Sequence, residues 1–194
     1  MSKEAFASLV VTKLKSAVGT DGTKYSEETA MEAQKAIAEA ITQYLVANTR
    51  INIAYNGVFD NGSGADVVEA DSMQLEGACS STGRPSDYAS WISNLQSVIA
   101  SSFSVCSPSA SGVLTAFKPF NPTTGSLTIP QSKLAAACTN NSANPALAVW
   151  GIICGSIIDW INTGKGKNPT IATIPATRNG ASTGSVSLVS IIVN

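Results

Sequence analysis

Few residues in this chain have the types and spacing that catalysis requires. The segment Gly180-Ala-Ser-Thr-Gly184 matches the G-x-S-x-G pattern of a serine nucleophile. That nucleophile needs a strand before the serine and a helix after it. Here the pattern predicts a strand after Ser182, and the chain has no histidine that could act as the base. We therefore expect Ser182 to be an ordinary residue of a turn and strand.

Four carboxylates stand close together in a Gly- and Asp-rich segment, residues 57–72: Asp60, Asp66, Glu69 and Asp71. Paired carboxylates can do acid–base chemistry or bind a hard cation such as calcium. Their spacing does not match the EF-hand loop, and no neighbouring residue is positioned to hold a substrate. We expect a solvated surface loop, with a weak calcium site as the alternative.

The four cysteines, Cys79, Cys106, Cys138 and Cys154, are far apart and form no C-x-x-C pair. Structural zinc sites need paired spacing or histidine ligands. We therefore expect no metal and no cofactor. Two interpretations of the cysteines remain open: buried thiols, or one or two disulfides that form after the protein leaves the cytoplasm.

Basic residues do not cluster as phosphate binding requires. The nearest approach to a cluster is Lys165, Lys167 and Arg178, and the net charge of the chain is only −1. The segment Gly164-Lys-Gly-Lys-Asn168 lacks the length and the Ser/Thr of a phosphate-binding loop. We expect no nucleic-acid partner.

The composition favours a folded protein with a weakly charged surface. Apolar residues make up 44% of the 194 residues and charged residues only 13%, about half the share of a typical soluble domain. Covering a small uncharged polar group costs much less free energy than covering an ion. Such a surface suits large permanent interfaces, although it also occurs on secreted proteins.

Neither the N-terminus nor the longest apolar segment carries a targeting signal. The first residues lack the apolar stretch and cleavage site of a signal peptide. The apolar segment from Ala146 to Ile161 is too short to span a bilayer and contains Asp159. We therefore expect synthesis in the cytoplasm and no membrane partner.

Two helices are predicted at the N-terminus. Apolar residues at three- and four-residue spacing predict an amphipathic helix over residues 3–18, and Gly19 is a natural stop. Ser26 is predicted to cap a second helix that ends near Asn48. Alanine dominates the first half of this helix, so another backbone could approach closely there. Together the two helices predict an αα-hairpin.

Two further helices carry the tryptophans. A stripe that includes Trp91 predicts a helix from about Tyr88 to Phe103, capped by Ser86 or Asp87. Asn144 and Pro145 predict the start of a helix that runs to about Ile161, includes Trp150 and Trp160, and is apolar all round. We expect it to be the central core element or to pack between subunits. The tryptophans are expected to pack in the core. A short helix is also predicted over residues 132–138.

Alternating apolar residues predict strands over residues 50–57, 73–79, 170–174 and 185–193, with irregular structure from Cys106 to Thr128. The last strand has no charge near its end, and an unpaired edge of that kind promotes aggregation. It is expected to pair within its own sheet, or alternatively into the sheet of a neighbouring subunit.

Several segments, in this order, resemble a virion structural protein of tailed bacteriophages. They are the helix Glu4–Val18, the segment Ile41-Thr-Gln-Tyr-Leu-Val-Ala-Asn-Thr49, the strand Ile51–Gly57, Asp87-Tyr-Ala-Ser-Trp91 and Pro145-Ala-Leu-Ala-Val-Trp-Gly-Ile-Ile-Cys154. The likeness spans most of the chain. It implies a many-copy component of a neck, tail, baseplate or capsid decoration, located in the virion, and it transfers no functional residue.

The sequence therefore predicts an α+β protein. Residues 1–49 form an N-terminal helical hairpin, and residues 50–194 form an α+β assembly domain with buried helices and a small, mainly antiparallel sheet. The expected function is non-enzymatic assembly with copies of itself and with other virion proteins, through the Ala-rich hairpin and the C-terminal strand. The alternative is a module that binds host receptors or glycans on the particle surface. A more distant alternative is a cell-wall hydrolase that uses Asp60 and Glu69.

Overall fold

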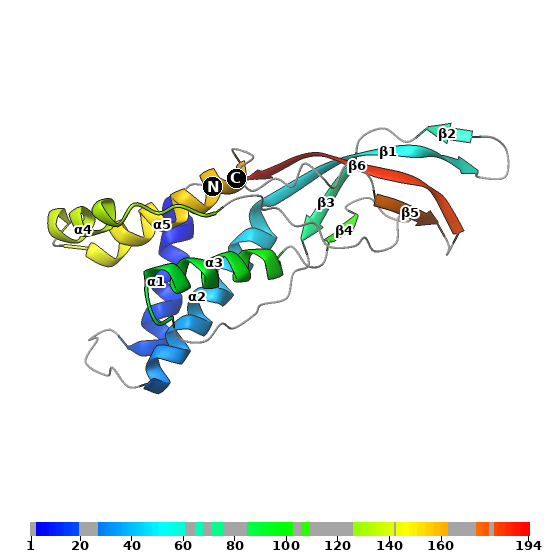
Figure 1. The fold of residues 1–194 in the computed structure, drawn as a ribbon. Coiled ribbons are helices and arrows are strands. Elements are labelled where there is room, and N and C mark those ends of the chain that lie inside the picture. The colour runs from blue at the N-terminus through cyan, green and yellow to red at the C-terminus, as the bar shows by residue number, and fades with distance from the viewer. Residues whose placement is uncertain are drawn as a thin grey trace.

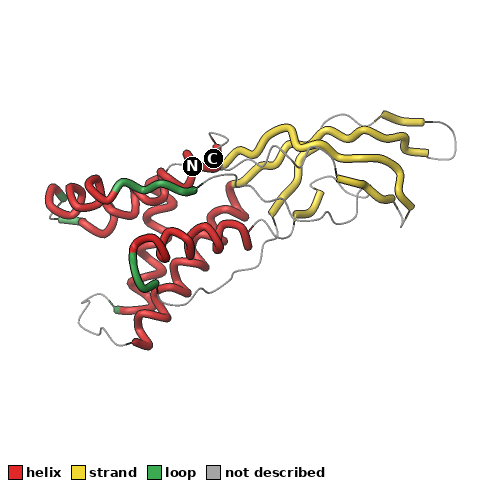
Figure 2. Tube along the Cα trace, viewed as in Figure 1, coloured by secondary structure: helices red, strands yellow, loops and turns green. Residues whose placement is uncertain are grey.

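The computed structural model describes residues 3–19, 27–60, 65–67, 71–75, 85–102, 106–108, 126–141, 143–162, 174–178 and 181–194. In most of the strands the description covers the backbone alone. Two kinds of structure are segregated along the length of the molecule: helices gather at one end, and strands extend from the other (Figures 1 and 2).

Five helices make up the helical end within the described residues. They are α1 (Lys3–Val18), α2 (Glu27–Asn48), α3 (Tyr88–Ser102), α4 (Gln131–Asn140) and α5 (Pro145–Asn162). All five were predicted from the sequence to within a few residues. Gly19 ends α1 with a positive φ of 80°, which glycine adopts without the steric cost that a Cβ would add. Asp87 caps α3, because its Oδ1 accepts a hydrogen bond from the backbone N–H of Ser90 at 2.7 Å. The predicted cap of α2, Ser26, lies outside the described residues.

Helices α1 and α2 pack against each other through aromatic and small side chains. The rings of Phe6 and Tyr44 stack with centroids 4.0 Å apart, and both side chains are buried. Ala38 and Ala40 of α2 are fully buried in the same core. Ala30 and Ala33, in the first half of α2, are only partly buried, so the expectation that a neighbouring subunit packs on this Ala-rich segment stays a prediction.

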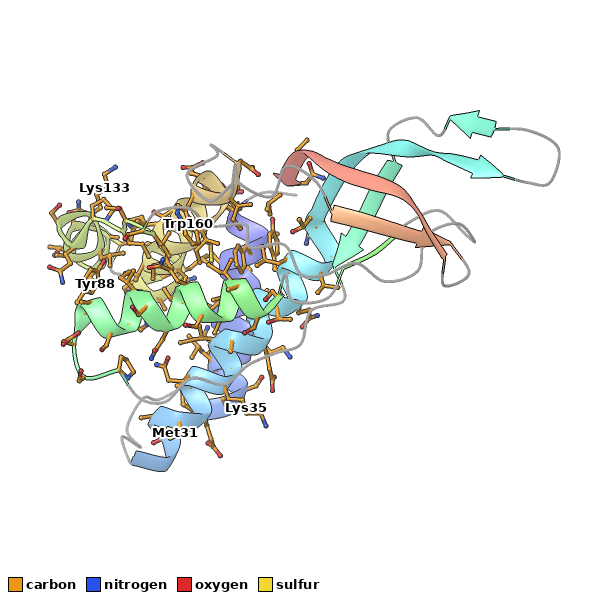
Figure 3. The ribbon with its side chains drawn as sticks, turned by 45° about the vertical axis from the view of Figure 1, so that its right-hand side comes forward. Met31, Lys35, Tyr88, Lys133 and Trp160 are labelled. Carbon is orange, nitrogen blue, oxygen red and sulfur yellow. The ribbon has the colours of Figure 1, made fainter. Side chains whose placement is uncertain are left out.

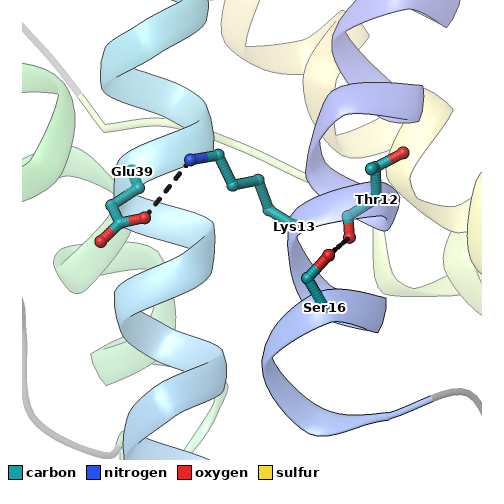
Figure 4. A network of polar contacts seen from close by, with 4 residues as sticks. All are labelled: Thr12, Lys13, Ser16 and Glu39. Carbon is teal, nitrogen blue, oxygen red and sulfur yellow. Dashed lines mark hydrogen bonds and ion pairs between the residues drawn. The ribbon is translucent and has the colours of Figure 1, made fainter.

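Polar contacts at the surface add little to the α1–α2 packing. Lys13 of α1 forms an ion pair with Glu39 of α2 at 3.4 Å, and Ser16 donates a hydrogen bond to the carbonyl of Thr12 one turn earlier (Figure 4). Both partners of the ion pair are more than one-third exposed, and such pairs contribute about 0–1 kcal/mol.

The rest of the core joins α3 and α5 to this pair of helices. α5 packs along α1, and α3 packs on α2. The largest fully buried side chains all belong to helices: Phe6, Ile41, Leu45, Ile99, Ile153 and Ile157. The contact between α1 and α5 crosses the predicted domain boundary at residue 49. The division into residues 1–49 and 50–194 stays a prediction.

The strands form ladders whose order is β4-β3-β1-β6-β5, with β2 paired to β1 alone. Their bounds are β1 Thr49–Asp60, β2 Ala65–Val67, β3 Asp71–Leu75, β4 Cys106–Pro108, β5 Ile174–Arg178 and β6 Ala181–Val193. Each neighbouring pair is antiparallel. The long pair β1 and β6 reaches away from the helices, which gives the molecule its extended outline (Figure 1).

The C-terminal strand pairs inside its own chain. β6 lies between β1 and β5, and its register with β1 runs from Gly57 opposite Gly184 to Thr49 opposite Val193. The prediction of pairing within its own sheet is confirmed. The alternative, in which this strand pairs into a neighbour's sheet, is not what the structure shows.

The α+β fold class predicted from the sequence was wrong. Among the residues whose side chains the structure describes, 83% are helical, and Val193 is the one strand residue among the buried apolar side chains of the core. The part of the chain whose side chains the structure describes is therefore mostly helical. The physical reason is that the strands extend beyond the helices instead of covering them, so no mixed core of helix and sheet is seen in the described residues.

Some element boundaries also differ from the prediction. The strand predicted at 170–174 is described at Ile174–Arg178, and the predicted loop at 57–72 contains the end of β1 and all of β2. The hydrogen-bonded ladder between Val58–Asp60 and Ala65–Val67 overrides the loop-like composition of this Gly- and Asp-rich segment. Residues 109–125 and 163–173 lie outside the described residues.

Candidate functional site

The residues considered for chemistry do not converge in the described structure. Ser182 lies in β6 opposite Thr177 of β5, so it has no helix after it and is not a nucleophile on a turn. Asp60 and Asp66 lie on β1 and β2 opposite Ala65 and Phe59. Asp71 begins β3, and Glu69 lies outside the described residues. No group of three or more metal-ligating side chains occurs in the described part of the chain.

Two of the four cysteines are described as free thiols. Cys154 of α5 is fully buried, and burial raises the pKa of its thiol far above the usual value. A thiol that stays protonated is a poor nucleophile. Cys138 of α4 is exposed, so the expectation of a buried thiol is confirmed for Cys154 and wrong for Cys138. Cys79 lies outside the described residues, and Cys106 is described by its backbone alone.

The tryptophans pack in the core, as predicted. Trp150 and Trp160 of α5 are buried. Trp91 of α3 is partly buried against that core and meets Trp150 edge-on with ring centroids 6.5 Å apart. Tyr88, which contacts Trp91, donates a hydrogen bond to the carbonyl of Ile129. These side chains hold α3 against α5 and the extended segment before α4.

Helix α5 buries one face and leaves the opposite face half exposed. The buried residues follow helical spacing: Trp150, Ile153, Cys154, Ile157, Trp160 and Ile161. They make up 33% of the helix. α5 contributes six residues to the core, but α1 and α4 cover only part of its circumference. Packing of its other face between subunits stays a prediction. By length and composition alone, α5 is also long and apolar enough to cross a membrane, a test that the core helix of a soluble protein passes as well.

The half-exposed face of α5 forms the floor of an open groove of about 690 Å³. Three small residues, Ala148, Gly151 and Gly155, line it at helical spacing, with Ile152 and Ile158 beside them. A Cβ added to Gly151 would meet no atom within 4 Å. Residues without large side chains let another backbone approach a helix closely. We name this feature the α5 groove.

Two lysines stand at the rim of the α5 groove. Lys3 of α1 and Lys133 of α4 both line it and are exposed. The aliphatic part of Lys3 lies over α5, since its Cδ is 3.6 Å from a Cβ built on Gly155. Neither lysine has an ion pair within the described residues. Asp159 also lines the groove and has an interaction of its own.

The C-terminal end of β6 is fixed beside this groove by side chains from two helices. Asn162, the last residue of α5, accepts a hydrogen bond from the N–H of Val193 at 2.7 Å and donates one to its carbonyl at 2.9 Å. Tyr44 of α2 donates a hydrogen bond to the carbonyl of Asn194 at 2.6 Å. The helices and the strands are therefore joined at this point by specific polar contacts.

Comparisons with known proteins give no relative for this chain. No family model, no curated protein and no solved structure matches it. The functional inference therefore rests on the geometry of the chain itself and on the resemblance seen in its sequence.

Sequence reasoning missed the α5 groove because the groove depends on tertiary packing. Lys3 and Lys133 are far apart in the sequence and come together only because α1 and α4 both pack on α5. One signal was present in the sequence. Gly151 and Gly155 are spaced by four in an apolar helix, a pattern typical of close helix–helix contact.

Proposed function

We propose that this chain is a non-enzymatic structural subunit that assembles with copies of itself and with neighbouring subunits. The observation that carries the proposal is the α5 helix, an apolar helix with one face buried and the other, which includes Ile152 and Ile158, only partly covered within the chain. Leaving apolar surface in water costs roughly 25 cal/mol per Å². Docking another protein on this face would recover that free energy.

The surface of the molecule supports the same proposal. The accessible surface is 10218 Å² for a chain of 19.9 kDa, whereas a compact monomer of that mass exposes roughly 8,700 Å². Extended subunits with low surface charge are suited to large interfaces, since few ions must be desolvated on contact. A virion of a tailed phage is the proposed setting, and the sequence resemblance is its support.

Light scattering behind size-exclusion chromatography tests the proposal on the purified chain, with and without reductant. The expected result is a discrete oligomer whose mass is unchanged by reductant. Loss of the oligomer under reductant would assign the link to cysteines instead of to apolar surfaces. A monomer under both conditions would contradict self-assembly, and retention of that monomer on host cells or a glycan array would support the alternative of a receptor-binding module.

A further inference from the structure

We propose that the side chain of Asn162 closes the edge of β6 and so prevents a second copy of this chain from pairing with that edge. Asn162 is the last residue of α5, and Val193 is the last residue of β6. Their contact is an inhibitory device built into the fold. It goes beyond the proposed function, because it concerns an association that the folded chain blocks.

The side-chain amide of Asn162 pairs with both backbone groups of Val193. Its Oδ1 accepts a hydrogen bond from the N–H at 2.7 Å, and its Nδ2 donates one to the carbonyl at 2.9 Å. An amide side chain carries an acceptor and a donor, as a peptide group does. In an antiparallel ladder, a residue of the facing strand makes these same two bonds. Asn162 therefore occupies the position that another strand would need in order to pair here.

The edge that Asn162 closes is the side of β6 turned away from β1. The next residue, Asn194, donates its N–H to the carbonyl of Asn48, directly before β1, at 3.0 Å. Successive residues of a strand point their backbone groups to opposite sides, so those of Val193 point away from β1. On that side β5 pairs with β6 only from Ala181 to Val186, and no other strand of the described residues lies there.

The stretch between these two contacts is suited to strand pairing. Residues 187–192 carry no charged side chain, and their number matches an average strand of about 5–6 residues. Ile192 is 41% exposed, one of three large apolar side chains that the described residues leave exposed. An uncharged apolar edge favours pairing with another chain. Every copy carries the same edge, so two copies can pair their β6 strands about a twofold axis.

The core of the helical end holds Asn162 in place. Both views show the end of α5 at the base of the long pair β1 and β6, and Figure 3 labels Trp160 two residues before Asn162 (Figures 1 and 3). Trp160 and Ile161 are buried, so they fix the last turn of the helix independently of its final side chain. Removing the amide should therefore open the edge while α5 stays in place.

Replacing Asn162 tests the device. Asn162→Leu keeps a side chain of similar size and removes both hydrogen bonds. In sedimentation velocity at matched concentrations, we expect a species of about twice the mass of the parent chain's species or more, since paired edges join two copies. Because each variant is compared with the parent chain's own species, the result has the same meaning whether the parent chain is a monomer or an oligomer.

Ser102→Ala is the matched control for lost stability. It removes a buried hydrogen bond in the core and leaves the contact between Asn162 and Val193 intact, so it should keep the mass of the parent chain. Circular dichroism shows whether each variant is folded. If Asn162→Leu does not fold, Asn162→Asp replaces it in the test, since a carboxylate still accepts from the N–H of Val193 but cannot donate to its carbonyl.

A charge on the opened edge should reverse the effect. Adding Ile192→Glu to Asn162→Leu places like charges on the two strands that would pair, and charged residues at an edge oppose pairing. We expect this double variant to return to the mass of the parent chain. Ile192→Glu alone should leave that mass unchanged.

Three outcomes would overturn the proposal. If the folded Asn162 variant keeps the mass of the parent chain, Asn162 blocks no pairing. If Ser102→Ala gains mass equally, the association reflects lost stability and not an open edge. If Ile192→Glu does not reverse the gain, the association uses another surface. Assembly of the parent chain itself bears only on the proposed function.

Discussion

The side-chain amide of Asn162 pairs with both backbone groups of Val193, at 2.7 Å from the N–H and 2.9 Å to the carbonyl. On the other side of β6, Val193 lies opposite Thr49 of β1, and Asn194 donates a hydrogen bond to the carbonyl of Asn48 at 3.0 Å. One asparagine thus takes the place that the backbone of a neighbouring strand would occupy. It also ties the end of α5 to the end of the sheet.

Replacing Asn162 should weaken the junction between helices and strands. Asn162→Leu leaves the N–H and carbonyl of Val193 without these partners, and we expect a loss of about 1–3 kcal/mol in the free energy of unfolding. Urea unfolding followed by circular dichroism measures it. The control is Asn140→Ala, because Asn140 is exposed at the end of α4. Equal stability of the Asn162 variant and the parent chain would show that these hydrogen bonds add nothing.

Tyr44 should make the stability of the protein fall with rising pH in the alkaline range. Burial is the main cause that raises the pKa of its phenol above the ordinary value of 10.0, and the phenol donates a hydrogen bond to Asn194. The unfolded chain therefore loses this proton at a lower pH than the folded chain. Stability from this group is fully present below pH 10 and is lost as pH rises through the folded pKa.

The comparison that isolates this effect is between the parent chain and Tyr44→Phe. Urea unfolding from about pH 8 to 11 should show a steeper fall in stability for the parent chain than for the variant, since the variant has no phenol at this position. Parallel pH profiles would rule out Tyr44 as the source.

The described core contains one buried pair of hydroxyls, and we expect the loss of one hydroxyl to cost more stability than the loss of the other. Thr42 of α2 and Ser102 of α3 lie with their oxygens 3.0 Å apart, and Ser102 also bonds the carbonyl of Val98 at 2.9 Å. Ser102→Ala leaves the hydroxyl of Thr42 buried without this partner, and we expect a cost of about 1–3 kcal/mol. After Thr42→Val, Ser102 still donates its hydrogen bond to the carbonyl of Val98. This change should therefore cost less in the free energy of unfolding than Ser102→Ala.

A double-mutant cycle completes this prediction. Adding Thr42→Val to Ser102→Ala removes the stranded hydroxyl, so the two changes together should cost less than the sum of the single changes. Thermal unfolding of the four proteins measures the coupling. Strict additivity would mean that the two hydroxyls do not interact in solution.

The two described thiols should differ in reactivity. We expect Cys138 to react with Ellman's reagent in the native protein, because it is exposed, and Cys154 to react only on unfolding, because it is buried and protonated. Cys138→Ser should remove a fast phase, whereas Cys154→Ser should leave the native time course unchanged. A fast phase that survives Cys138→Ser and disappears with Cys154→Ser would contradict the described burial.

Local patterns predicted the helices well because each pattern is contained within its own segment. The stripe through Leu95, Val98 and Ile99 predicted α3 and its buried face, and Gly19 marked the end of α1. The strand alternation at Ile51 and Ile53 likewise predicted the start of β1.

What the sequence did not predict depends on contacts between distant segments. An apolar helix such as α5 shows no polar face, so its composition cannot say which side meets the core, and the packing of α1 and α4 decides this. The Ala-rich first half of α2 was expected to contact a neighbour; the structure buries Ala36 inside the chain but leaves Ala30 and Ala33 only partly buried. The α+β prediction failed for the same reason, since strand patterns do not show whether helices cover the sheet.

Sedimentation velocity of the purified chain over about a hundredfold range of concentration is the most direct test of assembly. The account predicts a monomer at the lowest concentrations and a discrete larger species that grows with concentration, in reductant and without it. A single species of 19.9 kDa throughout that range would contradict it.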